Sequence, residues 1–240
     1  GPGLTQSEPQ MRQLTQRPKL QRAVTVRLKT ETRAISRHTD PKSEAQRRYS
    51  NARKARWFEP VVQRLGQVSG AAQRCMLCSG SEASDVEHYR PKAVFPLLAM
   101  DWENYLWACT ICNRAKGDRF PPDTEPGGRL VNPMDENVWQ FFFIDEFGLL
   151  TARYAVSKGD LDERASTTLR VLNLNREAVQ ESRQVRIRDL RGQVSEALRL
   201  YGAGDLTKGG LRQRVKEWLS QPFQPDVADY FRNGPGKSEH

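Results

Sequence analysis

Four cysteines form two pairs of identical spacing, and their type and separation indicate a metal site. The pairs are Cys75-Met-Leu-Cys78 and Cys109-Thr-Ile-Cys112, with 30 residues between them and no other cysteine in the chain. In a CxxC turn both sulfurs can face one ion at about 2.3 Å, so two such turns supply the ligands of a tetrahedral zinc site. The sequence therefore predicts one structural Zn²⁺ bound by Cys75, Cys78, Cys109 and Cys112.

A glutamate, a histidine and two asparagines accompany the cysteines. Glu87 and His88 lie between the pairs, Asn104 precedes the second pair, and Asn113 directly follows it. A neutral imidazole can take a proton from water at neutral pH, and carboxylate and amide oxygens suit Mg²⁺ or Mn²⁺. Phosphodiester hydrolysis needs these two functions, an activated water and a cation. A surface Glu–His pair is the plainer alternative, but its position between two metal-binding turns favours a site.

This arrangement resembles the HNH endonuclease family, whose ββα-metal fold joins a CxxC turn, an acidic residue and histidine at a strand end, a middle asparagine, and a CxxC turn that opens a helix. The resemblance implies that His88 is the general base and that Asn104 holds it in orientation. Asn113 matches the final position, where many members have histidine. Glu87 matches the acidic metal ligand, which is usually aspartate, and with Asn113 it would bind Mg²⁺ or Mn²⁺.

Four segments are similar, more closely, to the HNH subunits of Septu anti-phage systems and their retron-linked relatives. The likeness spans about residues 70–180 and is carried by His88–Lys92, Asp101–Leu106, Cys112–Pro121 and Thr168–Asn175. It implies a bacterial defence nuclease that works beside an ABC-type ATPase. A retron reverse transcriptase with its DNA–RNA hybrid is a further candidate partner.

The elements that position these residues follow from strand geometry. Neighbouring residues of a regular strand point to opposite sides, so bringing Glu87 and His88 to one site predicts an irregular strand end. We expect zinc to hold a hairpin against the helix that bears Asn113, within a nuclease core at residues 71–131. A separate β-hairpin is predicted at residues 132–158, with strands at Phe141–Ile144 and Leu149–Ala155.

The flanking regions are predicted to be mostly helical, which gives an α+β fold. Residues 11–70 form a basic region in which residues 20–37 allow a strand or a helix, and apolar spacing predicts a helix over Ser43–Leu65. Residues 159–240 are expected to hold a helix from Asn175, as N-cap, to Gly202, a helix over Leu211–Leu219, and a frayed tail. Residues 1–10 resemble a cloning remnant.

Basic residues outnumber acidic ones, 38 to 29, which gives a net charge of +9 and an isoelectric point near 9.6. Residues 11–74 carry +12, residues 75–149 carry −6, and residues 150–240 carry +4. This distribution suits basic arms that neutralise phosphates around an acidic metal-binding centre. Candidate phosphate contacts are Arg90, Lys92, Arg114 and Lys116, with ordinary surface charge as the alternative.

Length and hydropathy limit the classes of protein. A chain of 240 residues suits one large or two small domains, and its mean hydropathy is −0.73. It has no apolar run of the roughly 18–20 residues that a membrane span needs, and its N-terminus lacks the apolar core of a signal peptide. We therefore expect a bacterial cytoplasmic protein with no membrane partner. Two disulfides are the alternative to zinc, and a reducing compartment disfavours them.

These features predict a metal-dependent HNH endonuclease that cleaves nucleic acid, DNA first, with water activated by His88. One alternative is a non-catalytic, zinc-stabilised nucleic-acid-binding or adaptor subunit of an ATPase complex. Another is a structural scaffold for such an ATPase. The combination of Glu87, His88, Asn104 and Asn113 favours the enzyme.

Overall fold

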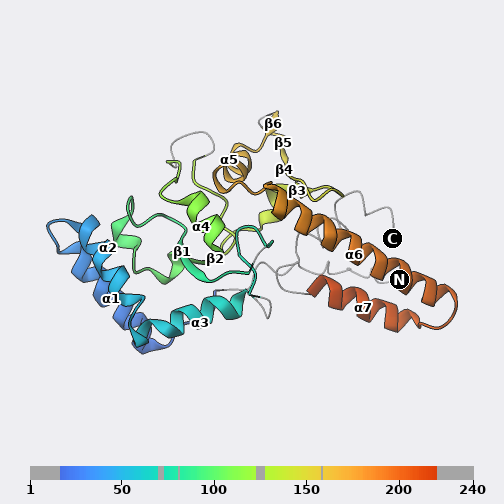
Figure 1. Cartoon of the computed structure of the whole chain (residues 1–240), viewed down its shortest axis with the longest axis horizontal. Coiled ribbons are helices and arrows are strands. Elements are labelled where there is room, and N and C mark those ends of the chain that lie inside the picture. The colour runs from blue at the N-terminus through green and yellow to red at the C-terminus, as the bar shows by residue number, and fades with distance from the viewer. Residues whose placement is uncertain (1–16, 70–72, 81, 123–127, 158, 221–240) are drawn as a thin grey trace, which may run out of the picture.

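The computed structural model describes residues 17–69, 73–80, 82–122, 128–157 and 159–220. Helices and three small antiparallel sheets of two strands each make up this part of the chain, so the fold is α+β as predicted (Figure 1). None of the described helices has the length and apolar character needed to cross a membrane. The predicted remnant at residues 1–10 and most of the predicted tail lie outside the described residues.

The basic N-terminal region begins with two helices, α1 (Arg22–Ser36) and α2 (Pro41–Ala52). The segment 20–37 forms a helix rather than a strand, because the buried residues of α1, Val24, Leu28, Glu31 and Ile35, follow helical spacing, whereas Val26 is 54% exposed. Asp40 caps α2 by accepting a hydrogen bond from the Ser43 amide at 3.1 Å. Buried carboxylates join the two helices, since Arg48 binds Glu31 of α1 and Glu44 of α2.

The single helix predicted over Ser43–Leu65 is wrong. The helix α2 ends at Ala52, a 3₁₀ turn, η1, follows at Arg56–Phe58, and α3 runs over Glu59–Val68. Ala55 interrupts the helix, because its backbone is extended, with φ −96° and ψ 137°. Pro60 occupies the first turn of α3, where its missing N–H has no cost.

The centre of the molecule contains a hairpin followed by a helix. The strands β1 (Asp85–His88) and β2 (Tyr105–Ala108) pair antiparallel, and the 3₁₀ turns η2 (Pro96–Leu98) and η3 (Trp102–Asn104) lie in the connection. The helix α4 (Thr110–Lys116) follows β2 after one residue and contacts β1. Pairing is regular from Asp85 opposite Ala108 to His88 opposite Tyr105, so the expected irregular strand end is absent from β1.

The predicted second hairpin is present and is shorter than expected. A 3₁₀ turn, η4 (Val138–Gln140), precedes β3 (Phe142–Ile144), which pairs with β4 (Leu150–Ala152). Asp145 shapes the turn between them, because its Oδ1 accepts hydrogen bonds from the amides of Phe147 and Leu149. A small additional hairpin, β5 (Tyr154–Ala155) with β6 (Asp160–Leu161), leads into α5 (Glu163–Leu172).

The C-terminal part is a pair of helices, α6 (Glu177–Gly202) and α7 (Lys208–Ser220). Figure 1 shows α6 running outward from the centre with α7 beside it. The predicted N-cap, Asn175, is one residue early, since Arg176 occupies the cap. The side chain of Asn175 instead brackets Leu150 of β4, accepting from its N–H at 2.9 Å and donating to its carbonyl at 2.7 Å.

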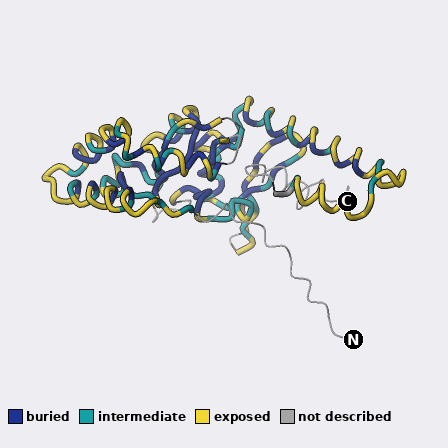
Figure 2. Tube along the Cα trace, turned by 90° about the horizontal axis from the view of Figure 1, so that it is seen from below, coloured by how far each residue is buried: buried dark blue, intermediate teal, exposed yellow. Residues whose placement is uncertain are grey.

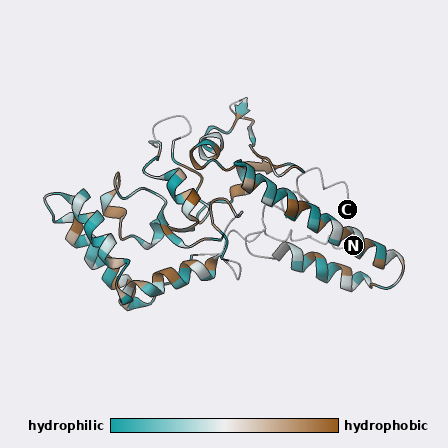
Figure 3. Cartoon of the chain, in the orientation of Figure 1, coloured by the Kyte–Doolittle hydropathy of each residue, from teal (hydrophilic) through white to brown (hydrophobic). Residues whose placement is uncertain are grey.

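Buried apolar residues form one contiguous cluster that reaches from Val24 of α1 to Val194 of α6. Figure 2 shows the buried segments gathered around the central hairpin, whereas the described part of α7 is mostly exposed. Figure 3 shows hydrophilic residues over most of α1 and α2. The central hairpin and the residues around the cysteines are therefore the best-shielded part of the described chain.

Candidate metal centre and catalytic site

The four cysteines converge as the sequence predicted. All four are buried and free, and their Sγ atoms lie within 4.8 Å of one another. The Sγ atoms of Cys78 and Cys109 are 4.0 Å apart, close to the roughly 3.8 Å between two sulfurs on a tetrahedral zinc ion. Four thiolates are the donor set of structural zinc, so these residues fit that metal.

A backbone hydrogen bond holds the first cysteine pair to the central hairpin, and the second pair opens the helix that follows it. The Met76 amide donates to the Trp107 carbonyl of β2 at 2.9 Å, which fixes the first pair beside this strand. Cys109 is the N-cap of α4, and its Sγ accepts from the Cys112 amide at 3.4 Å. A metal bound here would tie the segment before β1 to the start of α4.

His88 lies at the end of β1 and is 4% exposed. Its Nε2 is 2.9 Å from the Ala99 carbonyl oxygen, which also accepts from the Tyr105 hydroxyl at 2.8 Å. A carbonyl can only accept, so Nε2 carries the proton and Nδ1 of the neutral ring keeps its lone pair.

The surroundings of His88 keep it uncharged. Burial lowers the pKa of His88 to about 3; the Ala99 carbonyl opposes this, and the positive charges of Lys92 and Lys116 add to it. Tyr49 of α2 packs edge-on against the ring, with ring centroids 4.4 Å apart. The imidazole is thus neutral at pH 7 and enclosed by aromatic side chains.

Glu87 lies on the other side of β1 and faces α4. Its Oε1 accepts a hydrogen bond from Lys116 Nζ at 2.8 Å, and the Glu87 and Lys116 side chains are 9% and 0% exposed. Burial raises the pKa of Glu87 and lowers that of Lys116, while their mutual attraction opposes both shifts. Glu87 therefore has a buried ammonium as its partner, and it does not share a side of the strand with His88.

Lys116 does not have the exposed position that we expected of a phosphate contact. It lies three residues after Asn113 on α4, which puts both residues on neighbouring positions of one helix face. Asn113 is partly buried, and its backbone bonds within the helix, to the Cys109 carbonyl and from the Gly117 amide. Of the two, Lys116 contacts β1, at Glu87.

Asn104 fixes the chain that follows His88. Its Oδ1 accepts from the Arg90 amide at 2.8 Å, and its Nδ2 donates to the carbonyls of Arg90 and Leu98 at 2.9 and 3.0 Å. Its own carbonyl accepts from the Tyr89 amide at 2.8 Å. Asn104 thus holds the backbone beside His88, and its side chain bonds to backbone groups.

The other predicted phosphate contacts have different surroundings. The Arg90 guanidinium lies over two rings that contact each other edge-on, 5.1 Å from the centroid of Phe95 and 5.2 Å from that of Phe120. The Lys92 ammonium lies 5.2 Å from the centroid of the Tyr49 ring. Arg114 is exposed on α4. Arg90 and Lys92 are therefore stacked on aromatic rings at the edge of the site.

Two contributors to this region were missing from the sequence prediction. Tyr49 packs on His88 and donates from its hydroxyl to the Val86 carbonyl at 3.1 Å. Arg17 donates to the carbonyls of Trp102 and Tyr105 at 2.7 and 2.8 Å. Both act across more than 30 residues of sequence, and no local spacing signals such contacts.

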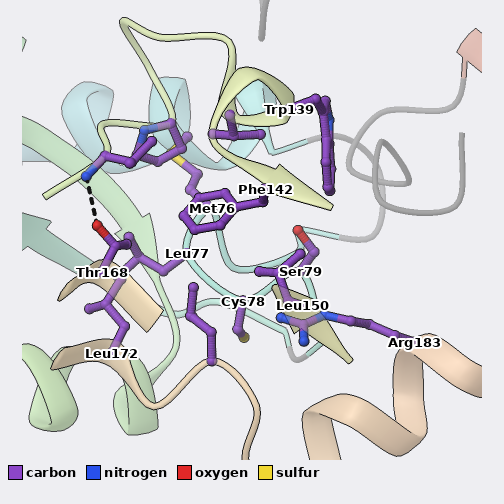
Figure 4. A pocket seen from close by; sticks show the side chains of 14 residues that line it. Met76, Leu77, Cys78, Ser79, Trp139, Phe142, Leu150, Thr168, Leu172 and Arg183 are labelled. Atoms are coloured by element: carbon purple, nitrogen blue, oxygen red, sulfur yellow. Dashed lines mark hydrogen bonds between the residues drawn. The ribbon is translucent and has the colours of Figure 1, made fainter. Parts of the chain in front are cut away.

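A cavity of about 60 Å³ lies beside the first cysteine pair. Figure 4 shows its lining, which joins Met76, Leu77 and Ser79 to residues of β3, β4, α5 and α6. This volume corresponds to about two water molecules, so the cavity is a packing seam rather than a substrate site. The lining of the cavity shows that β3, β4, α5 and α6 pack around the turn that carries Cys75 and Cys78.

The class defined by these observations is an α+β protein with a buried four-cysteine centre that can bind a structural metal. No family model matches the chain. The chain is 28% identical to the Septu protein PtuB of Bacillus thuringiensis over 124 residues, which are 50% of this chain. The matched region is 43% of that relative, so the chain spans less than half of its length. This distant similarity supports a Septu-related protein.

Proposed function

We propose that this chain is an HNH-type endonuclease that cleaves nucleic acid, DNA first. One arrangement carries the proposal: His88 ends the first strand of a hairpin that four cysteines join to a following helix bearing Asn113. This order of elements, with these residue types on them, is the one that the resemblance to the HNH family led us to expect, and it supports the proposal.

His88 is the proposed general base. Its Nε2 is held by the Ala99 carbonyl, which leaves Nδ1 as the atom that takes a proton from the attacking water. A bound phosphate would raise the pKa of the buried ring by its negative charge and make it a better base. The His88 ring is held in one orientation by its contacts with Ala99, Tyr105 and Tyr49. Its Nδ1 atom therefore needs no reorientation before it takes the proton.

Asn104 and the basic side chains position the substrate in this proposal. Asn104 fixes the Arg90 backbone, and Arg90 and Lys92 follow His88 by two and four residues. Cations this close to the base hold a phosphate and stabilise negative charge that develops on it. Their aromatic stacking partners restrain them, which lowers the entropy lost on binding.

The residues fit one of the two predicted metals better than the other. The four thiolates fit zinc, which would hold the hairpin against α4. The Glu87 carboxylate as it lies does not fit direct binding to Mg²⁺ or Mn²⁺, because the Lys116 ammonium occupies its Oε1. Binding of that cation by Glu87 and Asn113 would require Lys116 to release Oε1, and the assay below tests whether cleavage depends on the cation.

The biological setting follows from the relative. The similarity to the Septu protein PtuB supports a role in Septu-type anti-phage defence. We propose an ABC-type ATPase as the partner subunit, and a retron reverse transcriptase with its DNA–RNA hybrid as the alternative partner. Co-expression of the chain with each partner followed by co-purification distinguishes them.

The test of the nuclease is cleavage of supercoiled plasmid, linear duplex and single strands in Mg²⁺, Mn²⁺ or EDTA, with and without the ATPase. We expect His88→Ala to abolish cleavage, because it removes the imidazole that takes the proton from water in this proposal. His38→Ala is the matched control, since His38 is exposed at the end of α1. Zinc content of each variant checks the fold. Wild-type activity in His88→Ala would refute the role of His88.

A second candidate function is a non-catalytic nucleic-acid-binding or adaptor subunit. The enclosed position of His88 and the Glu87–Lys116 pair favour it, since both residues have internal partners. It predicts that wild-type protein binds DNA but leaves it intact under every condition above. It also predicts that binding is unchanged by His88→Ala and that the ATPase still co-purifies.

A further inference from the structure

The first turns of α6 lie against the four-cysteine centre. Val179 packs on Gly80, its Cγ2 lying 3.2 Å from the point that a Cβ on Gly80 would occupy. One turn later the Ser182 hydroxyl donates to the Gly80 carbonyl at 3.4 Å, and Arg186 Nη1 donates to the Ser79 carbonyl at 3.1 Å. One helix face therefore binds the turn that follows Cys78.

Arg176, the N-cap of α6, reaches the cysteines themselves. Its Nη2 donates to Cys112 Sγ at 3.5 Å, a contact that spans 64 residues of sequence. The guanidinium is always charged and keeps further N–H donors for a second sulfur. It approaches from the C-terminal part of the chain, whereas all four cysteines belong to the central part.

The negative charge of a zinc–thiolate centre explains why a positively charged side chain lies beside it. Zn²⁺ with four thiolates carries a net charge of −2, and the four cysteines are buried. Burying a net charge is costly unless an opposite charge or hydrogen bonds compensate it. The Arg176 guanidinium supplies both, and the N-terminal end of α6 adds a favourable dipole.

We propose that Arg176 is an outer partner of the zinc–thiolate centre and that zinc binding is coupled to docking of the α6–α7 pair. Coupling is reciprocal: the amount by which docked α6 strengthens zinc binding equals the amount by which zinc strengthens docking. The proposal rests on the cysteine geometry and the α6 contacts, and it holds whether or not the chain is a nuclease.

The test compares Arg176→Gln with wild type and with Arg188→Gln, an exposed arginine on the same helix. We expect Arg176→Gln to weaken zinc binding about 10-fold, as loss of outer-shell partners typically does, and to speed zinc transfer to a chelator. The Co²⁺-loaded variant should show a shifted sulfur-to-cobalt charge-transfer band. Arg188→Gln should match wild type, and Arg176→Lys should recover part of the affinity. Zinc affinity and a cobalt spectrum like those of wild type in Arg176→Gln would overturn the proposal.

Amide hydrogen exchange measures the coupling in the other direction. In zinc-loaded Arg176→Gln, exchange should rise in residues 177–186 and stay unchanged in α1 and α2, which Figure 1 shows on the opposite side of the central hairpin from α6. This readout is independent of any global loss of stability. Unchanged protection of residues 177–186 would contradict the coupling even if zinc affinity fell.

Discussion

At the scale of single residues, the Glu87–Lys116 pair places two opposite charges in the interior of the described chain. Both side chains are buried, and their contact at 2.8 Å ties β1 to α4. Removing one partner of such a pair leaves an uncompensated buried charge, whereas replacing both by apolar residues of similar size removes the problem. A substitution of one member of the pair should therefore destabilise the protein more than replacement of both members.

Lys116→Met should lower the free energy of unfolding by about 3–5 kcal/mol, because the Glu87 carboxylate is left without its ammonium. The double variant Glu87→Leu/Lys116→Met should recover most of this loss. Urea unfolding of zinc-loaded protein measures both. Arg199→Met is the control, since the Arg199–Glu196 pair is exposed and should contribute nothing measurable. Equal stability of Lys116→Met and Arg199→Met would show that the buried pair is not formed.

Residue types and spacing predicted the cysteine cluster but not this pair. Two CxxC turns restrict their sulfurs so strongly that convergence on one ion follows from the sequence alone. Lys116 gave no comparable signal, because its partner lies 29 residues away and is chosen by how α4 packs on β1. A lysine in a short helix that carries another basic residue, Arg114, is more often a surface charge.

At the scale of elements, the turn between β3 and β4 is locked against α6. Gly148 has φ +77°, and a Cβ there would lie 2.4 Å from the Gln180 carbonyl oxygen and 2.8 Å from the Gln184 amide nitrogen. These are backbone atoms of a helix, so they cannot turn aside as a side chain does. The Arg183 guanidinium adds a bond of 3.4 Å to the Gly148 carbonyl.

Gly148→Ala should therefore destabilise the protein by two separate effects. The positive φ costs about 1–2 kcal/mol for any residue with a Cβ, and the clash with α6 adds about 1–3 kcal/mol. Gly204→Ala is the matched control, because Gly204 has φ +81° and nothing lies within 4 Å of its Cβ position. Thermal unfolding of the two variants separates the effects. Equal losses would mean that the hairpin does not contact α6 as described.

Periodicity predicted most of the helices, and it failed where another rule competes with it. The apolar spacing over Ser43–Leu65 continues across residues 53–58, so it indicated one helix, yet the extended backbone of Ala55 ends the helical run before η1 and α3. At Asn175 the residue type suggested an N-cap, but bonds to Leu150 of β4 use both ends of its side chain. In both cases a contact or constraint outside the local pattern decided the structure.

At the scale of the whole molecule, the basic N-terminal arm and the central site are parts of one packed body. The buried cluster that contains Val24 of α1 also contains Val86 beside Glu87. No sequence pattern predicted that α2 covers His88 or that α6 closes on the cysteines, because both contacts depend on how distant elements pack. The charge distribution, in contrast, follows directly from the sequence, and it leads to a prediction about nucleic-acid binding.

The exposed face of α1 should contribute to nucleic-acid binding. Arg22, Lys29 and Arg33 recur at helical spacing on the face opposite the buried residues, and all three are exposed. Neutralising phosphates releases counterions, so each phosphate contact contributes about 0.9 to the slope of log K against log salt for duplex DNA. We expect Arg22→Gln/Lys29→Gln/Arg33→Gln to weaken duplex binding and to flatten this slope by up to about 2.7, measured by fluorescence anisotropy between low and moderate salt.

The triple variant Lys208→Gln/Arg212→Gln/Lys216→Gln removes the same charge from exposed positions of α7 and serves as the comparison. If only the α7 variant lost affinity, the C-terminal arm would be the electrostatic footprint. If both variants lost it equally, net charge rather than a surface on α1 would govern binding.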